Sequence, residues 1–398
     1  MKARHQLKNA RPGGMTVAGI MSGTSADGID VAVVRIRPGK HGLRLTLVAH
    51  EAVSFAKPLR AAVLAAMDSK NTSTAELARL HWRLGIAYAE AVRLTLRKHP
   101  QKIDLIGCHG QTIYHQGTPE KYGGSKFACT WQIGEMAMLT SEFGVPVVSN
   151  FRPADMVAGG QGAPLVSLLD YVMFRHSARG RVLQNLGGIA NLTAIPPGAR
   201  LEDLVAFDSG PANMLIDAMT QTLFDMSCDS GGRIAAKGTV LPTVLRQSIR
   251  HPFFRRQPPK SAGREEFGAA FAADFLRRCK TASPHPKDAV ATATALTAHS
   301  IGMAYERFVQ PLMKDARVDY LLSGGGAQNR TLVAMLGREL TPLGCKVGTT
   351  EQAGLPPQAK EAAAFALLAY ETWHRRPGNV PAATGATRPA ILGNITYA

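Results

Sequence analysis

Hydrophobic and polar residues alternate with two different periods along the chain, and each period predicts one type of element. Residues 15–56 alternate in the manner of strands, with a turn at 38–42. From Thr74 to Lys98 the apolar residues recur at helical spacing, which predicts a helix there. Shorter elements follow in the order strand 103–108, strand 128–132, helix 134–143 and strand 146–149. This succession of strands and helices predicts a mixed α/β domain.

The second half of the chain begins again with a strand, a turn and a strand. We expect strands at 181–186, 191–195, 204–207 and 318–323, and helices at 212–224, 292–309 and 359–373. Because both halves open alike, we expect two related α/β domains around a cleft, although the halves share no visible sequence similarity. The predicted parts are a disordered basic tail at 1–13, an N-terminal domain at 14–150 and a C-terminal domain at 151–374, with 375–398 packing back on the first domain.

Composition narrows the class of protein. A chain of 398 residues that is 45% hydrophobic can bury the cores of two domains. Its five cysteines are scattered without a C-x-x-C pair, so they indicate neither a disulfide framework nor a zinc site. No apolar run approaches the length of about 18 residues that a membrane span needs, and the basic N-terminus lacks an apolar signal core. We therefore expect a cytoplasmic protein without a membrane partner.

The net charge of +17 is the unusual feature of the composition. Basic surfaces attract nucleic-acid backbones. Here, however, the Lys and Arg residues are dispersed, and the densest patch, 253–260, lies in a loop-like stretch. Two interpretations remain open, namely attraction of anionic small substrates and a solvated basic surface. A nucleic-acid partner is not expected.

The turn at 22–30 joins two predicted strands and carries most of the candidate chemistry. Its small and hydroxyl-bearing residues are Ser22, Gly23, Thr24, Ser25 and Gly28. They supply a backbone that bends freely, with hydroxyl and N–H groups that can face an anion. Asp27 and Asp30 add carboxylates of the kind that a divalent metal escorting a phosphate prefers. The residues alone leave open an ordinary polar hairpin turn and a phosphate-binding loop.

Four further segments are polar, glycine-rich and placed where predicted strands end, at 109–112, 150–161, 207–211 and 323–329. Ligand sites of α/β folds gather at such strand ends. The chain has no P-loop, no G-x-G-x-x-G motif and no H-R-D kinase loop. Gly324–Gly326 would let the adenosine side of a nucleotide approach the backbone, or would serve tight packing of a strand against a helix.

Each candidate side chain also has an ordinary structural interpretation. Taken alone, His109 is more often a hydrogen-bonded structural histidine than a base. Asp208 can be a base or metal carboxylate, or a turn residue that caps a helix. Arg152 and Asp155, three apart in a predicted loop, can bind a polar substrate or pair with each other. Glu361 is a favourable charge near a helix N-terminus.

Eight motifs, in their order along the chain, resemble those of the anhydro-N-acetylmuramic acid kinases. They are Gly-Ile-Met-Ser-Gly-Thr-Ser-Ala-Asp-Gly-Ile-Asp (19–30), His-Gly-Gln-Thr (109–112), Gln-Ile-Gly-Glu (132–135), Phe-Arg-Pro-Ala-Asp (151–155), Ala-Gly-Gly-Gln-Gly-Ala-Pro-Leu (158–165), Asn-Leu-Gly-Gly-Ile-Ala-Asn (185–191), Phe-Asp-Ser-Gly-Pro-Ala-Asn (207–213) and Gly-Gly-Gly-Ala-Gln-Asn (324–329). The resemblance covers nearly the whole chain. Ala212 departs from it, because the family usually has Gly there.

The resemblance implies a fold and a reaction. The fold is the two-domain actin-like ATPase (ribonuclease H-like) architecture, an α/β fold with ATP and the active site in the cleft between the domains. Members of the family use ATP and Mg²⁺ to open the 1,6-anhydro ring of anhydro-N-acetylmuramic acid and to phosphorylate the 6-oxygen. The product, N-acetylmuramic acid 6-phosphate, belongs to peptidoglycan recycling.

The resemblance also implies roles for particular residues. Asp208 matches the catalytic base, and Thr112, Arg152, Asp155 and Glu361 match substrate-binding positions. The ATP-binding positions are Gly23, Thr24, Ser25, Ala26, Asp27, Gly28, Ile29 and Asp30 in the phosphate loop, with Gly324, Gly325 and Gly326 on the adenosine side. Mg²⁺ is expected to bind mainly through the ATP phosphates, and its protein ligands are not assigned.

Two alternatives to this function remain open. One is a kinase of the same fold for another 1,6-anhydro-sugar such as levoglucosan, against which Arg152 favours an acidic substrate. The other is a non-catalytic nucleotide-dependent binding protein of the Hsp70-like fold, against which the combination of Asp208 with an intact phosphate loop argues. The expected partners are ATP and the sugar alone, and a homodimer is compatible with the resemblance.

Overall fold

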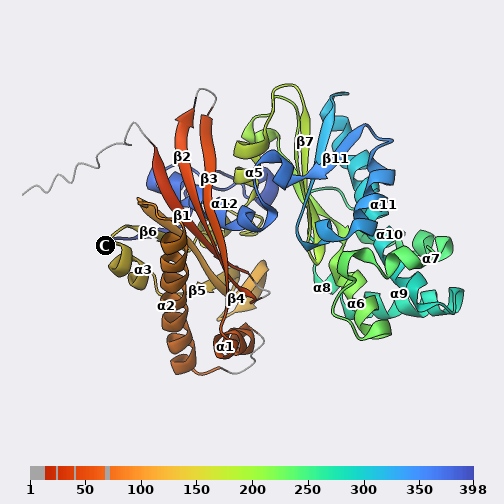
Figure 1. Cartoon of the computed structure of the whole chain (residues 1–398), viewed down its shortest axis with the longest axis horizontal. Coiled ribbons are helices and arrows are strands. Elements are labelled where there is room, and N and C mark those ends of the chain that lie inside the picture. The colour runs from red at the N-terminus through yellow and green to blue at the C-terminus, as the bar shows by residue number, and fades with distance from the viewer. Residues whose placement is uncertain (1–13, 24–25, 40–41, 68–71) are drawn as a thin grey trace, which may run out of the picture. The chain divides into compact units, whose positions relative to one another are not determined.

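The computed structural model describes residues 14–23, 26–39, 42–67 and 72–398, so the predicted tail at 1–13 lies outside the described residues. The chain divides into two compact units: unit 1 is Met1–Met173 with Gln358–Ala398, and unit 2 is Phe174–Pro357. Each unit has its own sheet and hydrophobic core (Figure 1). Within the described ranges, no helix is long and apolar enough to cross a membrane.

Unit 1 is built on a mixed sheet. Its strands are β1 (Met15–Ser22), β2 (Gly28–Gly39), β3 (Gly42–Ser54), β4 (Leu105–Tyr122), β5 (Ser125–Ile133), β6 (Val147–Ser149) and β12 (Asn394–Thr396). Its helices are α1 (Lys57–Met67), α2 (Thr74–Lys98), α3 (Ala137–Phe143), α4 (Arg152–Val157), α12 (Lys360–Trp373) and α13 (Pro381–Thr384), and α5 (Ser167–Phe174) ends at the division between the units. The strand order is β12-β6-β4-β1-β2-β3, with β5 paired to β4.

Unit 2 is built on a second mixed sheet. Its strands are β7 (Gly180–Leu186), β8 (Ile189–Ile195), β9 (Val205–Pro211), β10 (Val318–Ser323) and β11 (Cys345–Thr349), in the order β11-β10-β7-β8-β9. Its helices are α6 (Asn213–Phe224), α7 (Pro242–Ser248), α8 (Arg264–Phe267), α9 (Ala269–Ala282), α10 (Pro286–Ala304) and α11 (Arg330–Leu340).

The two sheets share one topology. In unit 1, β1, β2 and β3 pair antiparallel in succession, and β4 and β6 add on the other side of β1 as parallel strands. In unit 2, β7, β8 and β9 pair antiparallel, and β10 and β11 add beside β7 as parallel strands. The predicted class, two related α/β domains, is therefore confirmed by strand order and direction.

Two facing glycines seat helix α12 on the sheet of unit 1 (Figure 1). Gly19 on β1 and Gly107 on β4 are register partners. A Cβ atom at Gly19 would lie 1.9 Å from the carbonyl oxygen of Ala362, and one at Gly107 would lie 2.2 Å from that of Phe365. The backbone of α12 thus touches the backbone of both strands, because neither strand carries a side chain at that point.

This packing explains why the compact units differ from the predicted domains. The predicted boundaries put 151–173 and the helix at 359–373 in the C-terminal domain, whereas both stretches belong to unit 1. Helix α12 contacts β1, β2 and β4, and its small Ala side chains allow the close approach. At the end of the chain, β12 pairs antiparallel with β6 at the sheet edge.

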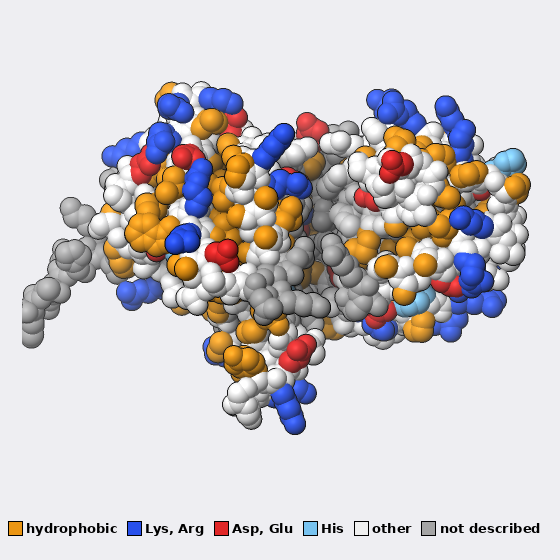
Figure 2. All heavy atoms as spheres, turned by 90° about the horizontal axis from the view of Figure 1, so that it is seen from below, with side chains coloured by type: hydrophobic (Ala, Val, Ile, Leu, Met, Phe, Trp, Pro, Cys, Tyr) orange, Lys and Arg blue, Asp and Glu red, His pale blue; other side chains and the backbone are white. Residues whose placement is uncertain are grey.

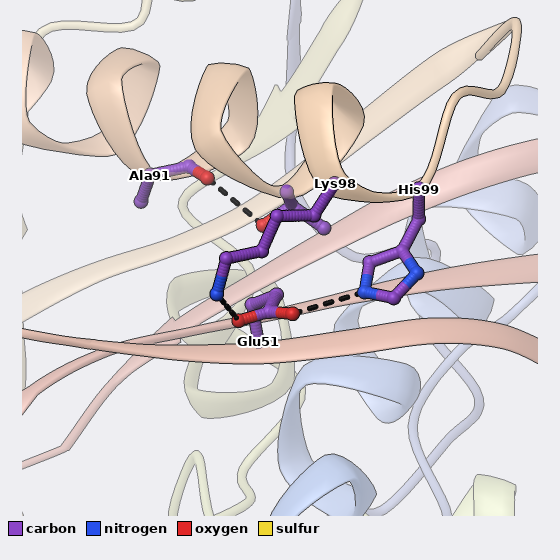
Figure 3. Close-up of polar contacts among 5 residues, drawn as sticks. Glu51, Ala91, Lys98 and His99 are labelled. Carbon is purple, nitrogen blue, oxygen red and sulfur yellow. Dashed lines mark hydrogen bonds and ion pairs between the residues drawn. The ribbon is translucent and has the colours of Figure 1, made fainter.

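Helix α2 occupies the predicted range and is held at both ends. Ser73 and Glu76 form a capping box at its N-terminus. At the other end, Glu51 of β3 accepts hydrogen bonds from Lys98 Nζ at 2.7 Å and His99 Nε2 at 2.9 Å (Figure 3). These bonds hold the pKa of the Glu51 carboxyl below its ordinary value, against a smaller opposing effect of burial. The last turn of α2 is thereby fixed to a strand.

Two local predictions differ from the structure. The segment 109–112 was expected at the end of a strand, but β4 continues through it to Tyr122 and forms a long ribbon with β5. The residues of this ribbon are largely exposed, so apolar alternation does not reveal it. The predicted loop at 150–161 contains helix α4, which begins at Arg152 and continues to Val157.

Basic side chains are interspersed with other types on the face that Figure 2 draws. Lys and Arg side chains are scattered there among acidic and hydrophobic ones. This distribution agrees with the dispersed basic residues of the sequence.

Candidate active site

The turn between β1 and β2 is held by side chains from neighbouring elements. Ala26 N–H donates to the Gly23 carbonyl at 3.1 Å, and Ala26 has a left-handed φ of 52°. Gln111 Nε2 of β4 donates to the Gly23 carbonyl at 3.1 Å, and Arg60 Nε of α1 donates to the Ala26 carbonyl at 3.1 Å. The bonds fix the turn on both sides. Thr24 and Ser25, predicted to bind ATP, lie outside the described residues.

The remaining residues of the predicted phosphate loop divide into structural and accessible ones. Ile29 belongs to the hydrophobic core of unit 1, and a Cβ at Gly28 would lie 2.4 Å from the Val53 carbonyl oxygen. Asp30 accepts from His50 Nε2 at 2.9 Å, whereas Asp27 is exposed and 3.9 Å from Arg60. Asp27 is therefore the more available carboxylate of the turn.

Arg152, the first residue of α4, lies in a network that includes the predicted segment at 109–112. Its Nε donates to His109 Nε2 at 2.9 Å, and its Nη1 donates to the Gly162 carbonyl at 2.6 Å. Burial lowers the pKa of the guanidinium to about 10, although Glu361 and Asp155 act to raise it. Arg152 is therefore charged at neutral pH.

Asp155 serves the protein's own loops. Its Oδ2 accepts the Gly162 N–H at 2.8 Å, and its Oδ1 accepts Asn379 Nδ2 at 2.8 Å and Thr384 Oγ1 at 2.7 Å. The residue is fully buried. Neither carboxylate oxygen of Asp155 is therefore exposed for the predicted contact with substrate. Asp155 instead holds Gly162, whose carbonyl accepts from Arg152.

Thr112 lies in a short hydrogen-bonded row across β4 and β5. Gln132 Nε2 donates to Thr112 Oγ1 at 3.2 Å and to Thr130 Oγ1 at 2.8 Å, and His115 Nδ1 lies 3.0 Å from Thr130 Oγ1. Because the Thr112 hydroxyl accepts from Gln132, its own O–H is left to donate. Gln132 belongs to a motif that the sequence analysis noted without giving it a role.

Glu361 lies in the first turn of α12, where the residue is accessible to solvent although protein atoms surround its carboxyl. Desolvation raises the pKa of its carboxyl, and the negative charge of Asp30 adds to this effect, whereas Arg152 and Lys360 oppose it. Glu361 is therefore electrostatically coupled both to the β1–β2 turn and to Arg152. Unit 1 brings together the turn, the 109–112 segment, Arg152 and Glu361.

In unit 2, Asp208 lies near the end of β9 and is partly exposed. Its backbone N–H donates to the carbonyl of Lys260, and its Oδ2 accepts the N–H of Ala262 at 2.8 Å. The segment 260–262 therefore holds both the backbone and the carboxylate of Asp208. The helix-capping alternative is not realised, because the N-cap of α6 is Ala212 and has no side-chain hydrogen bond.

Lys260 places a cation near this carboxylate. Its Nζ lies 4.7, 5.0 and 5.7 Å from the ring centroids of Phe253, Phe308 and Phe207, and it donates to the Phe253 carbonyl at 3.2 Å. Desolvation lowers the pKa of Lys260 to about 8; the cations Arg307 and Arg256 act in the same direction, and Asp208 opposes them. The sequence does not predict this arrangement, because Phe207, Phe253 and Phe308 are far apart in the chain and form no motif.

The glycines at 324–326 are partly explained by packing. Gly324 has a left-handed φ of 80°, and a Cβ there would lie 2.5 Å from Asn185 Oδ1. A Cβ at Gly326 would lie 2.7 Å from Leu186 Cβ, whereas Gly325 has free space beyond 3.8 Å from Asn213. Close packing on the end of β7 thus accounts for two of the three glycines, and Gly325 is the one with room beside it.

Comparison with known proteins decides the family. The family model for anhydro-N-acetylmuramic acid kinase (AnmK) matches residues 15–398. The chain belongs to this kinase family. It is 43% identical over 386 residues to anhydro-N-acetylmuramic acid kinase of Bacillus cereus (strain G9842), covering 96% of this chain and 99% of the relative. It is 42% identical over 387 residues to that of Bacillus anthracis (strain A0248), with the same coverage.

Solved structures resemble the chain more distantly. A component A of (R)-2-hydroxyglutaryl-CoA dehydratase from Acidaminococcus fermentans has a TM-score of 0.43 at 14% identity, with 90% of this chain and 99% of that chain covered. A ROK family glucokinase from Streptomyces griseus has a TM-score of 0.37 at 8% identity, with 89% and 99% covered. Similarity this low identifies neither a ligand nor an activity for this kinase.

Proposed function

We propose that the chain converts anhydro-N-acetylmuramic acid, water and ATP to N-acetylmuramic acid 6-phosphate and ADP. Membership of the kinase family supports the reaction. The observation that carries the assignment of the base is the position of Asp208, whose carboxylate is partly exposed, fixed through one oxygen by the Ala262 N–H, and placed near the Lys260 cation. A base must be held at the reacting atom, and the segment 260–262 bonds both to the backbone N–H of Asp208 and to its carboxylate.

In this proposal Asp208 takes a proton from water as the water oxygen bonds to the anomeric carbon of the sugar. The bond between that carbon and the bridging oxygen breaks, and its electron pair stays on the oxygen. The freed 6-oxygen then bonds to the γ-phosphorus of ATP, and ADP departs with the electron pair of the broken P–O bond. Phosphoryl transfer needs chiefly positioning and neutralisation of charge.

The residues of unit 1 supply recognition in the same proposal. Arg152 carries a positive charge beside the Thr112 segment, which suits the carboxylate of the lactyl group. The segment 23–30 is the phosphate-binding loop in this proposal, by its match to the family motif, and Gly325 offers room on the adenosine side. Asp27 is exposed and suits Mg²⁺, which keeps most of its waters and binds through few carboxylates and the phosphates. Mg²⁺ would neutralise charge on the triphosphate. We place the reaction in the cytoplasm.

The test is the rate at which purified Asp208→Asn protein forms the 6-phosphate. General-base catalysis contributes about 100- to 10,000-fold, so we expect kcat to fall by that factor with little change in KM. Asp203→Asn, at an exposed position in the same unit, is the matched control. An Asp208→Asn protein with the rate of the wild type would refute the base. Equal turnover of levoglucosan would refute the lactyl carboxylate as the recognised group.

A further inference from the structure

The hydrogen bonds around His109 define which of its ring nitrogens carries the proton. An arginine Nε–H can only donate, so His109 Nε2, which receives it from Arg152 at 2.9 Å, carries no proton. The proton is therefore on Nδ1, which donates to the Gly110 carbonyl at 2.7 Å. Burial and the Arg152 cation lower the pKa of His109 well below its ordinary value of 6.5. The imidazole is a neutral acceptor.

The backbone around His109 is shaped to present the ring in this way. The pairing of β1 with β4 shifts register between Ile20 and Ser22, and Gly110 has a left-handed φ of 80°. Such a bulge re-aims a side chain that would otherwise follow the strand alternation. The ring centroid of Phe365 on α12 lies 4.6 Å from that of the imidazole, so the two rings are in contact.

The guanidinium of Arg152 is held from two directions and retains free donors. His109 accepts from Nε, and the Gly162 carbonyl accepts from Nη1; Gly162 is itself anchored by Asp155. An arginine has five N–H donors. Among the described residues, three of the five have no acceptor in the protein. They are available to an anionic group.

We propose that His109 is a positioning residue for substrate recognition: it accepts the Nε–H of Arg152 and thereby orients the three remaining N–H donors for the carboxylate of the sugar. The inference rests on the proposed function, since it takes Arg152 as the contact to that carboxylate. His109 itself touches no reacting atom. Its contribution is to fix a long side chain that would otherwise lose rotamer entropy on binding.

Two neutral polar variants separate this role from simple packing. In His109→Gln the side-chain oxygen reaches about as far as Nε2 and can accept from Arg152. In His109→Asn the side chain ends near the place of Nδ1, so it can serve Gly110 but not Arg152. We expect His109→Gln to keep KM for anhydro-N-acetylmuramic acid within about 3-fold, and His109→Asn to raise it about 10- to 100-fold, with KM for ATP unchanged.

A double-mutant cycle shows whether the effect passes through Arg152. Arg152→Ala should raise KM for the sugar at least as much as His109→Asn, and the double variant should be no worse than Arg152→Ala alone. The inference is overturned if the two effects multiply, if His109→Gln and His109→Asn behave alike, or if KM for ATP rises equally. The proposed function fails separately, if the wild type does not phosphorylate the sugar or if Arg152→Ala leaves its KM unchanged.

Discussion

At the scale of single residues, Lys260 shows how a buried positive charge is tolerated near the carboxylate of Asp208, the proposed base. Lys260 is 9% exposed, and three aromatic rings with one carbonyl replace its water. Cation–π contacts and a hydrogen bond recover only part of the hydration of an ammonium group. The lowered pKa of Lys260, about 8, is the visible consequence.

This lowered pKa predicts a rise of stability with pH. An unfolded lysine keeps its proton up to its ordinary value of 10.5, whereas folded Lys260 releases it near 8. Between these values the unfolded chain binds one proton more, so the contribution of Lys260 to the free energy of unfolding increases with pH. We expect the free energy of unfolding of the wild type, minus that of Lys260→Met, to rise by at most about 1.4 kcal/mol per pH unit from 8 to 10. Denaturant titrations at several pH values measure the two free energies. Lys121→Met, at an exposed position, is the control. A difference between wild type and Lys260→Met that does not change with pH would contradict the prediction.

The sequence identified the residue types of the site better than their contacts. Arg152, Thr112 and Asp208 stand in recognisable motifs. In unit 1 Arg152 bonds to His109, and Thr112 follows Gln111, whose amide bonds to the Gly23 carbonyl of the β1–β2 turn. The role of Asp155 could not be read in the same way, because its partners Asn379 and Thr384 lie more than two hundred residues further along the chain. Neither the spacing of residues nor their type predicts which distant loop will donate hydrogen bonds to a given carboxylate.

At the scale of elements, the seat of α12 depends on having no side chain at Gly19 and Gly107. We expect Gly19→Ala to lower the free energy of unfolding by about 1–3 kcal/mol or more, because its Cβ would lie 1.9 Å from a backbone oxygen that no side-chain rotation can move. In the control Gly337→Ala, on helix α11, the new Cβ meets nothing within 4 Å. That variant should gain about 0.5–1 kcal/mol. Thermal unfolding measures the midpoints of the two variants. Equal midpoints would show that close packing of α12 does not require glycine at position 19.

The anchor of α2 predicts a dependence on acid. The pKa of Glu51 is lowered by its bonds to Lys98 and His99, so its stabilising contribution is present above its unfolded value of 4.5 and is lost as the pH falls through the folded value. Glu51→Gln should therefore unfold at a lower temperature than the wild type at neutral pH. The two proteins should converge once the pH falls below the lowered pKa of Glu51 in the folded protein. Glu120→Gln, at an exposed position on β4, is the control: its unfolding temperature should match that of the wild type at every pH.

Elements were predictable where buried apolar residues recur at regular spacing or form a continuous run. The range of α2 follows from apolar residues at helical spacing, and the β1–β2–β3 meander follows from alternation. The outer part of the β4–β5 ribbon has few buried residues, so the sequence predicts the buried start of β4 and residues 128–132 of β5 but not the continuation of β4 to Tyr122. The position of α12 depends on glycines in two strands far away in sequence, so its Ala-rich composition predicts a helix but not the unit it joins.

At the scale of the whole molecule, the same strand order occurs twice with little sequence in common. Both sheets place three antiparallel strands beside two parallel ones. The candidate residues lie at different places in the two sheets: in unit 1 they include the turn between β1 and β2, and in unit 2 Asp208 lies on β9, the third antiparallel strand. In the proposed function, the same strand order therefore supports different roles in its two copies: recognition of phosphate and sugar in unit 1, and the base in unit 2.

The net charge of +17 either attracts anionic substrates or only keeps the surface hydrated, and the salt dependence of the reaction separates these two interpretations. Both proposed substrates are anions, and dispersed basic side chains such as those in Figure 2 would raise their local concentration through long-range attraction. The Debye length shortens from about 30 Å at 0.01 M salt to about 3 Å at 1 M. If the charge steers substrates, kcat/KM for ATP should fall about 10-fold over this range, while kcat changes less than about 2-fold. Sucrose at matched viscosity controls for diffusion. A kcat/KM independent of salt would show that the basic side chains only keep the surface hydrated, because screening would then remove no attraction on which binding depends.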